Sequence, residues 1–157
     1  MGELAAAAGS ADVLVSLGLG SCIGLALVDR RTGVAGLAHV VLPASDGHSA
    51  GQNPLKFADH AVPELISRVV RLGGRRPKLE AVLVGGASMF TVSSGALEVG
   101  QRNEAAVREL LKALRIPVIA AETGGKRGRT IRVHVDTTRV TVREAGGKES
   151  DLVEGRA

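Results

Sequence analysis

Hydrophobic residues fall into short apolar runs separated by glycine, proline and polar residues, a pattern typical of β-strands. Runs rich in Val, Leu, Ile and Ala predict strands at 12–16, 22–29, 34–42, 79–84, 117–121, 130–135 and 139–143. A turn at Arg30–Gly33 separates the second and third runs, and Thr137-Thr138 separates the last two. We therefore expect two hairpins, and an antiparallel meander over the first third of the chain.

Two segments have helical patterns. Between Pro54 and Leu72, apolar residues recur with the spacing of one broad helix face, and Gly73-Gly74 ends the segment. A second helix is expected from Asn103 to Leu114, with Asn103 as its N-cap. The stretch 88–100 before it is expected to be a loop.

The chain has the size of one domain and shows no internal repeat. We expect a flexible start at 1–11, a single domain at 12–143 and a polar tail at 144–157. The first ten residues contain no basic residue, and their apolar stretch is too short for a signal peptide. No run approaches the roughly 20 apolar residues of a membrane helix. We therefore expect a cytoplasmic protein without membrane insertion.

The amino-acid composition limits the classes of binding partner that are expected. Two Phe are the only aromatic residues, so the core is built from aliphatic side chains, and stacking platforms for single-stranded nucleic acid are not expected. The formal net charge is +4, and the basic residues are spread out, with the densest clusters at 71–78 and 126–132. We expect these clusters to be solvated loops or strand edges, and no nucleic-acid partner.

The single cysteine, Cys22, follows a glycine-rich turn and begins an apolar strand. Gly18 and Gly20 can adopt backbone conformations that other residues avoid. Such a turn can present one side chain together with several backbone N–H groups, including those of Gly20 and Ser21. These N–H groups are candidate donors to an oxyanion. The alternative is that Cys22 is a small buried hydrophobic residue.

A reactive thiol needs a base, and His39 in the third predicted strand is the best placed of four histidines. The midpoint between positions 22 and 39 falls in the predicted Arg30–Gly33 turn, so a hairpin brings Cys22 and His39 nearly opposite each other. The alternative is a core histidine. His48, His60 and His134 are expected at the surface.

Other kinds of site are less consistent with the sequence. Gly18, Gly20 and Gly24 have a spacing similar to a dinucleotide-binding loop, but that loop opens a helix and this one opens a strand. One cysteine and scattered histidines show no metal-ligand spacing, so no metal is expected. Gly85 and Gly86, after a buried strand, either line the substrate site or permit a tight turn.

At these residues the sequence resembles the CheD family, the chemoreceptor glutamine deamidases of bacterial chemotaxis. The resemblance extends over roughly 13–142 and is strongest in SLGLGSC at 16–22, GLAHVVLP at 36–43 and VGGASMF at 84–90. Further similar segments are KFADHA at 56–61, GQRN at 100–103 and ETGGKRGR at 122–129. The resemblance implies an α+β fold of packed mixed, largely antiparallel β-sheets flanked by helices.

The resemblance also implies a reaction. Cys22 would be the nucleophile and His39 the general base, while Ser16 stands where the family usually has a threonine whose hydroxyl orients the histidine. The substrate would be glutamine side chains of methyl-accepting chemotaxis receptors, converted to glutamate with release of ammonia and without metal or organic cofactor. Family members often bind a CheC-type phosphatase, and Met89-Phe90 is a candidate contact. The alternative is a non-catalytic adaptor that binds receptors or such a phosphatase.

Overall fold

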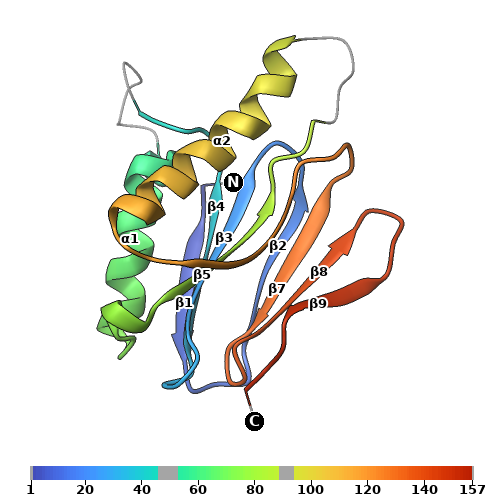
Figure 1. The fold of residues 1–157 in the computed structure, drawn as a ribbon. Helices are drawn as coiled ribbons and strands as arrows, with labels where there is room; N and C mark the ends of the chain where they lie inside the picture. Colours follow the sequence, from blue (N-terminus) through green and yellow to red (C-terminus); the bar gives the residue numbers. More distant parts are fainter. Residues whose placement is uncertain (1, 46–52, 89–93, 157) are drawn as a thin grey trace.

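The fold has three layers, with two helices on one face of a five-stranded sheet and a four-stranded sheet on the other (Figure 1). A computed structural model describes residues 2–45, 53–88 and 94–156, with the backbone alone for 94–98. This arrangement confirms the expected α+β class with packed mixed and antiparallel sheets. In the described part of the chain, no helix combines the length and apolar character needed to cross a membrane.

The first sheet has the order β1-β4-β3-β5-β6, with β5 and β6 parallel and the other neighbours antiparallel. Its strands are β1 (Leu4–Ala8), β3 (Ile23–Asp29), β4 (Val34–Val40), β5 (Glu80–Gly85) and β6 (Val118–Thr123). The second sheet is antiparallel in the order β2-β7-β8-β9. Its strands are β2 (Val13–Leu19), β7 (Arg129–His134), β8 (Arg139–Glu144) and β9 (Glu149–Val153).

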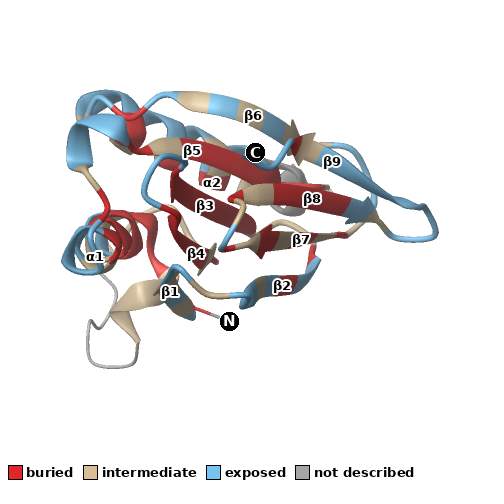
Figure 2. Ribbon diagram, turned by 90° about the horizontal axis from the view of Figure 1, so that it is seen from below, coloured by how far each residue is buried: buried red, intermediate tan, exposed pale blue. Residues whose placement is uncertain are grey.

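The central strand β3 is buried along its whole length, as Figure 2 shows. Leu25 and Leu27 pack in the cluster between this sheet and the helices, whereas Ala26 and Val28 pack in the cluster between the two sheets. Burial on both faces explains why β3 reads as a continuous apolar run and not as an alternating one. It also defines two sides of the sheet, and the side facing β2 and β7 carries the candidate site.

Both predicted hairpins are confirmed, because β3 pairs with β4 and β7 pairs with β8. The expected meander over the first third is wrong. Strand β2 does not pair with β3; it lies in the second sheet beside β7, more than a hundred residues later. Local sequence carries no signal for such a distant pairing partner.

Both chain ends are more ordered than the sequence indicated. The expected flexible start contains β1, which adds an edge strand beside β4. The expected polar tail contains β9, which pairs with β8. Alanine and acidic residues have low β-propensity, so neither segment resembles a strand when it is read alone.

The helices differ in how well they were predicted. Helix α1 (Ala58–Arg71), preceded by a short 3-10 turn at Pro54–Lys56, agrees with the predicted apolar face. A second 3-10 turn, Arg76–Lys78, leads into β5. Helix α2 spans Ser94–Ala113 and so begins within the predicted loop. Asn103 is therefore not an N-cap; it lies in the middle of α2 and is fully buried.

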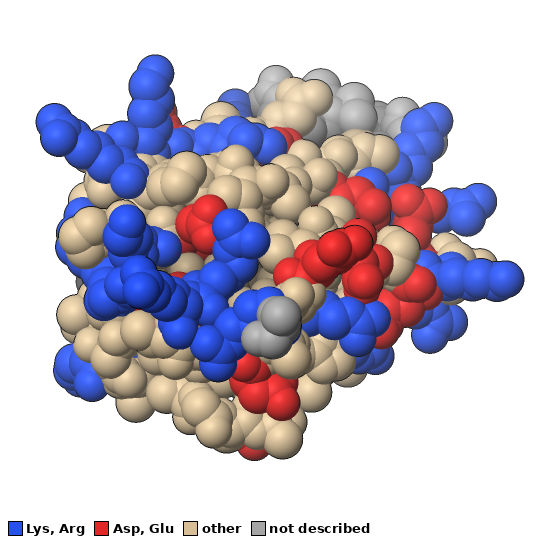
Figure 3. All heavy atoms as spheres, turned by 60° about the horizontal axis from the view of Figure 1, so that its bottom comes forward, with Lys and Arg blue, Asp and Glu red and all other residues tan. Residues whose placement is uncertain are grey.

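Basic residues are prominent on the face that Figure 3 shows, with acidic residues among them. Part of the 71–78 cluster is neutralised by ion pairs. Arg75 forms a bidentate pair with the buried Asp29, with Nη2–Oδ1 and Nε–Oδ2 distances of 2.9 and 3.0 Å. Arg30 pairs with Glu80 at 2.7 Å in a more exposed position.

Asp29 also accepts hydrogen bonds from the backbone N–H groups of Arg31 and Thr32, and so closes the β3–β4 turn.

Replacing Asp29 with alanine is expected to lower the free energy of unfolding by about 3 kcal/mol, because it removes the buried partner of a hydrogen-bonded ion pair. The Arg75 guanidinium holds the pKa of the Asp29 carboxyl well below its usual range. The stabilisation is therefore complete above the pKa of an unfolded aspartate and is lost as the pH falls toward the folded pKa. Urea denaturation of the wild type and the variant at several pH values measures this loss of unfolding free energy. Glu80→Ala, the exposed counterpart, is the control and should cost less than about 1 kcal/mol; equal losses in both variants would contradict the prediction.

Candidate active site

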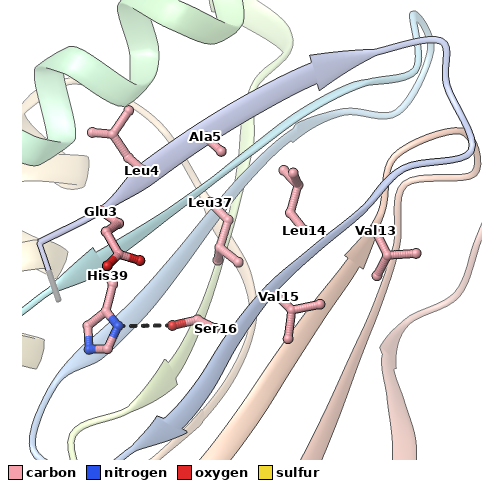
Figure 4. A pocket seen from close by; sticks show the side chains of 9 residues that line it. All are labelled: Glu3, Leu4, Ala5, Val13, Leu14, Val15, Ser16, Leu37 and His39. Atoms are coloured by element: carbon pink, nitrogen blue, oxygen red, sulfur yellow. Dashed lines mark hydrogen bonds between the residues drawn. The ribbon is translucent and has the colours of Figure 1, made fainter.

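Ser16 and His39 meet between the two sheets. Ser16 lies on β2 of the second sheet, His39 lies on β4 of the first, and Ser16 Oγ is 3.1 Å from His39 Nδ1 (Figure 4). The β2–β7 register shifts between Ser16 and Leu19, so β2 is irregular where it carries the hydroxyl. Ser16 is only 6% exposed, which shields this hydrogen bond from competing water.

The second ring nitrogen of His39 is available. His39 Nε2 is buried and, within residues 2–45, 53–88 and 94–156, has no hydrogen-bond partner. A neutral imidazole has one N–H and one acceptor nitrogen. When Nδ1–H donates to Ser16 Oγ, Nε2 becomes the acceptor. The Ser16 contact thus accommodates the tautomer in which Nε2 takes a proton, and it fixes the orientation of the ring.

Cys22 lies on the same side of the first sheet as His39. It directly precedes β3, packs against the core cluster between the sheets and is half-buried. His39 is paired with Gly24, and Cys22 lies two residues before Gly24, diagonally from His39 and just outside the ladder. The predicted alignment was thus off by two residues, but the parity that puts both side chains on one face is kept. In a regular ladder, diagonal neighbours on one face have Cα atoms about 7–8 Å apart.

Burial sets the protonation states of this pair. It raises the pKa of the Cys22 thiol and lowers the pKa of the His39 imidazole, although the Glu3 carboxylate opposes the shift at His39. Both shifts favour the neutral forms, thiol and imidazole, near neutral pH. Among the hydrogen bonds between described residues, none joins the Cys22 thiol to the imidazole. Neither shift favours a preformed thiolate–imidazolium ion pair.

Gly85 and Gly86 lie behind the Cys22 turn. The Gly86 N–H donates to the Cys22 carbonyl and the Ala87 N–H donates to the Gly20 carbonyl, both at 2.8 Å. A side chain on Gly85 would collide with the Cys22 carbonyl, and Gly85 has a φ of 114° that disfavours any other residue. These contacts give both glycines a structural role in the turn. Direct contact of Gly85 or Gly86 with substrate stays a prediction.

The carbonyls of Gly20 and Cys22 thus point back into the protein. Within the described residues, the N–H groups of Gly20, Ser21 and Cys22 donate no backbone hydrogen bond outside the strand ladders. Donors of this kind are what an oxyanion requires. The geometry is compatible with the predicted role of Gly20 and Ser21, and it removes the Gly86 and Ala87 N–H groups as candidates.

Three further residues at the site were missed by the sequence analysis. The Glu3 carbonyl accepts the His39 backbone N–H at 2.9 Å, and its side chain lies beside the imidazole in Figure 4. Buried Arg129 donates to the Gly124 carbonyl at 2.7 Å and more weakly to the Gly85 carbonyl at 3.4 Å. Asn103 donates to the carbonyl of Ser21. Glu3 was assigned to a flexible start and Asn103 to a cap, whereas Arg129 belonged to a cluster expected to be solvated.

A pocket of about 220 Å³ opens beside the imidazole, as Figure 4 shows. It is lined by residues 3–5, 13–16, Leu37 and His39. Its walls are mostly aliphatic, and Val13 and Val15 at its rim are more than 40% exposed. Met89-Phe90, the candidate partner contact, lies outside the described residues.

Ser16 and His39 are in contact, and Cys22 lies on the same side of the first sheet as His39; a thiol, an imidazole and a hydroxyl are groups that cysteine hydrolases use. The family model for CheD chemotactic sensory transduction matches residues 41–144. Among curated relatives, a probable chemoreceptor glutamine deamidase CheD from Clostridium kluyveri is 43% identical over 141 residues, which cover 88% of this chain and 87% of the relative. A relative with the same description from Clostridium botulinum strain Hall is 44% identical over 137 residues, which cover 86% of this chain and 85% of the relative. The chain belongs to the CheD family.

Proposed function

We propose that this protein is a chemoreceptor glutamine deamidase, which hydrolyses glutamine side-chain amides of methyl-accepting chemotaxis receptors to glutamate and releases ammonia. The observation that carries the proposal is the placement of Cys22, His39 and Ser16 on facing surfaces of the two sheets, in a chain whose curated relatives are described as probable chemoreceptor glutamine deamidases. Cys22 is the nucleophile, His39 the general base and acid, and Ser16 the group that orients His39.

The first half of the reaction forms a thioester. The Cys22 sulfur attacks the carboxamide carbon while His39 Nε2 takes the thiol proton, because the neutral pair must separate charge at the moment of attack. The tetrahedral oxyanion accepts hydrogen bonds from N–H groups of the 20–22 turn. The intermediate collapses when the C–N bond breaks. The imidazolium returns its proton to the departing nitrogen, which leaves as ammonia.

The second half restores the enzyme. A water molecule gives a proton to His39 and attacks the thioester carbon. The C–S bond breaks, the sulfur recovers its proton from His39, and the product is a glutamate side chain. One water is consumed and one ammonia is released. Every proton passes through the same imidazole nitrogen, Nε2, while the Ser16 hydroxyl holds the ring in place through Nδ1.

The test uses a purified receptor cytoplasmic fragment. We expect ammonia release together with a mass increase of about one dalton at specific glutamine side chains, located by mass spectrometry. Because Cys22 is the only cysteine in the chain, iodoacetamide modifies a single site and should abolish both signals. Receptor binding without ammonia release would contradict the proposal and favour the non-catalytic adaptor that binds receptors or a CheC-type phosphatase.

A further inference from the structure

Asn103 joins the two backbone segments that carry the candidate nucleophile and base. Its Nδ2 donates to the Ser21 carbonyl at 2.9 Å and to the Val41 carbonyl at 2.8 Å. Ser21 directly precedes Cys22, and Val41 is two residues after His39. One side-chain amide therefore reaches both segments.

The bridge lies where the sheet ends. The last β3–β4 pair at this end is Ile23 with Val40, and beyond it both segments leave the ladder. In the described part of the chain, no backbone N–H outside the ladders donates to the carbonyl of Ser21 or of Val41. Asn103 thus takes over the connection between the two segments immediately beyond the last ladder pair, next to Cys22.

Neither helix formation nor packing explains an asparagine here. Asparagine is a poor residue for a helix interior, and Asn103 lies in the middle of α2 with no exposed surface. Its Oδ1 is buried and has no hydrogen-bond partner among the described residues. A buried amide oxygen without a partner is unfavourable, so an asparagine at this position needs an explanation. Here both donated bonds end on the backbone of the candidate active site.

We propose that Asn103 is a positioning residue for the deamidation reaction, which holds the Cys22 turn at a fixed distance from the strand that carries His39. This inference rests on the proposed function. Its hydrogen bonds between described residues end on the Ser21 and Val41 carbonyls, so it acts through these two backbone segments. Because no hydrogen bond between described residues joins the thiol to the imidazole, their approach depends on the backbone that carries them and on the Ser16–His39 hydrogen bond. A displacement of about 1 Å between reacting groups can lower a rate about 100-fold.

The test compares Asn103→Ala with Val107→Ala. Val107 lies one turn further along the same face of α2 and is equally buried, but it packs in the aliphatic core. Asn103→Leu keeps the branched shape without the donors and replaces the alanine variant if that variant does not fold. For each protein, kcat and KM with the receptor fragment, the melting temperature, and the pH dependence of Cys22 alkylation by iodoacetamide are measured.

For Asn103→Ala we expect a kcat about 100-fold lower with KM changed less than about twofold, since the altered distance affects the reaction and not receptor binding. The alkylation midpoint should fall toward the usual cysteine pKa, because a released turn loses part of the burial that raises it. Val107→Ala should lower the melting temperature but keep kcat and the alkylation midpoint. Equal kcat values in the two folded variants would overturn the inference.

The inference and the proposed function fail in different ways. If the wild type releases no ammonia from the receptor fragment, the proposed function is wrong. The alkylation profile then decides the inference alone. A midpoint lowered in Asn103→Ala but not in Val107→Ala supports the positioning of Cys22, and an unchanged midpoint overturns it.

Discussion

Replacing Cys22 with alanine is expected to lower ammonia release at least about 10⁴-fold, because removal of a covalent nucleophile leaves only binding and oxyanion stabilisation. The fold should survive this change. Cys22 is half-buried just before β3 and packs only partly against the core cluster between the sheets, so the loss of its sulfur atom leaves that cluster largely intact. We therefore expect a melting temperature within a few degrees of the wild type, and unchanged receptor binding in a pull-down with the cytoplasmic fragment.

Cys22→Ser is the matched control for shape. The hydroxyl is nearly isosteric with the thiol but is much harder to deprotonate, and burial lowers the pKa of His39, which makes the imidazole a weaker base. The serine variant should therefore be nearly as inactive as the alanine variant. Substantial ammonia release by Cys22→Ala would assign the chemistry to another residue, and release by Cys22→Ser alone would show that an oxygen nucleophile is sufficient.

Local pattern predicted the part of the site that lies on one hairpin. The turn between Asp29 and Val34 is short, so the Cys22 and His39 positions had to share one end and, by parity, one face of the sheet. The predicted turn Arg30–Gly33 is the observed one, closed by the pair Asp29–Val34. The register was nevertheless off by two residues, because the midpoint of positions 22 and 39 falls in this turn but one residue before its centre.

The remaining contacts depend on segments far apart in sequence. Ser16 reaches His39 only because β2 crosses to the second sheet and pairs with β7, whereas the sequence indicated a meander. Its predicted role came from resemblance to the family and not from its pattern. Asn103 approaches the Cys22 turn because α2 begins earlier than expected, through a stretch whose glycines favour a loop when read locally. Gly100 in that stretch is needed, since a side chain there would meet the Gly86 and Ala87 carbonyls.

Replacing His39 with glutamine is expected to lower kcat/KM about 10²- to 10⁴-fold, the usual contribution of a positioned general base. Glutamine keeps a polar side chain that can still reach Ser16 but cannot shuttle a proton. Ser16→Ala should cost less, about tenfold, because it removes the hydrogen bond that orients the ring and leaves the base in place. His60→Gln is the matched control. His60 is exposed and its Nε2 lies 3.1 Å from Ser45 Oγ, so activity close to that of the wild type is expected.

The pH profile distinguishes loss of the base from loss of structure. In the wild type, kcat/KM should rise as His39 loses its proton, and the lowered pKa of His39 places this rise below the usual histidine range. In His39→Gln, attack depends on thiolate formed without a base, and the raised pKa of Cys22 keeps that fraction small at neutral pH. Its residual activity should therefore increase about tenfold per pH unit up to and beyond the usual cysteine range. A His39→Gln profile parallel to that of the wild type would mean that another group accepts the thiol proton.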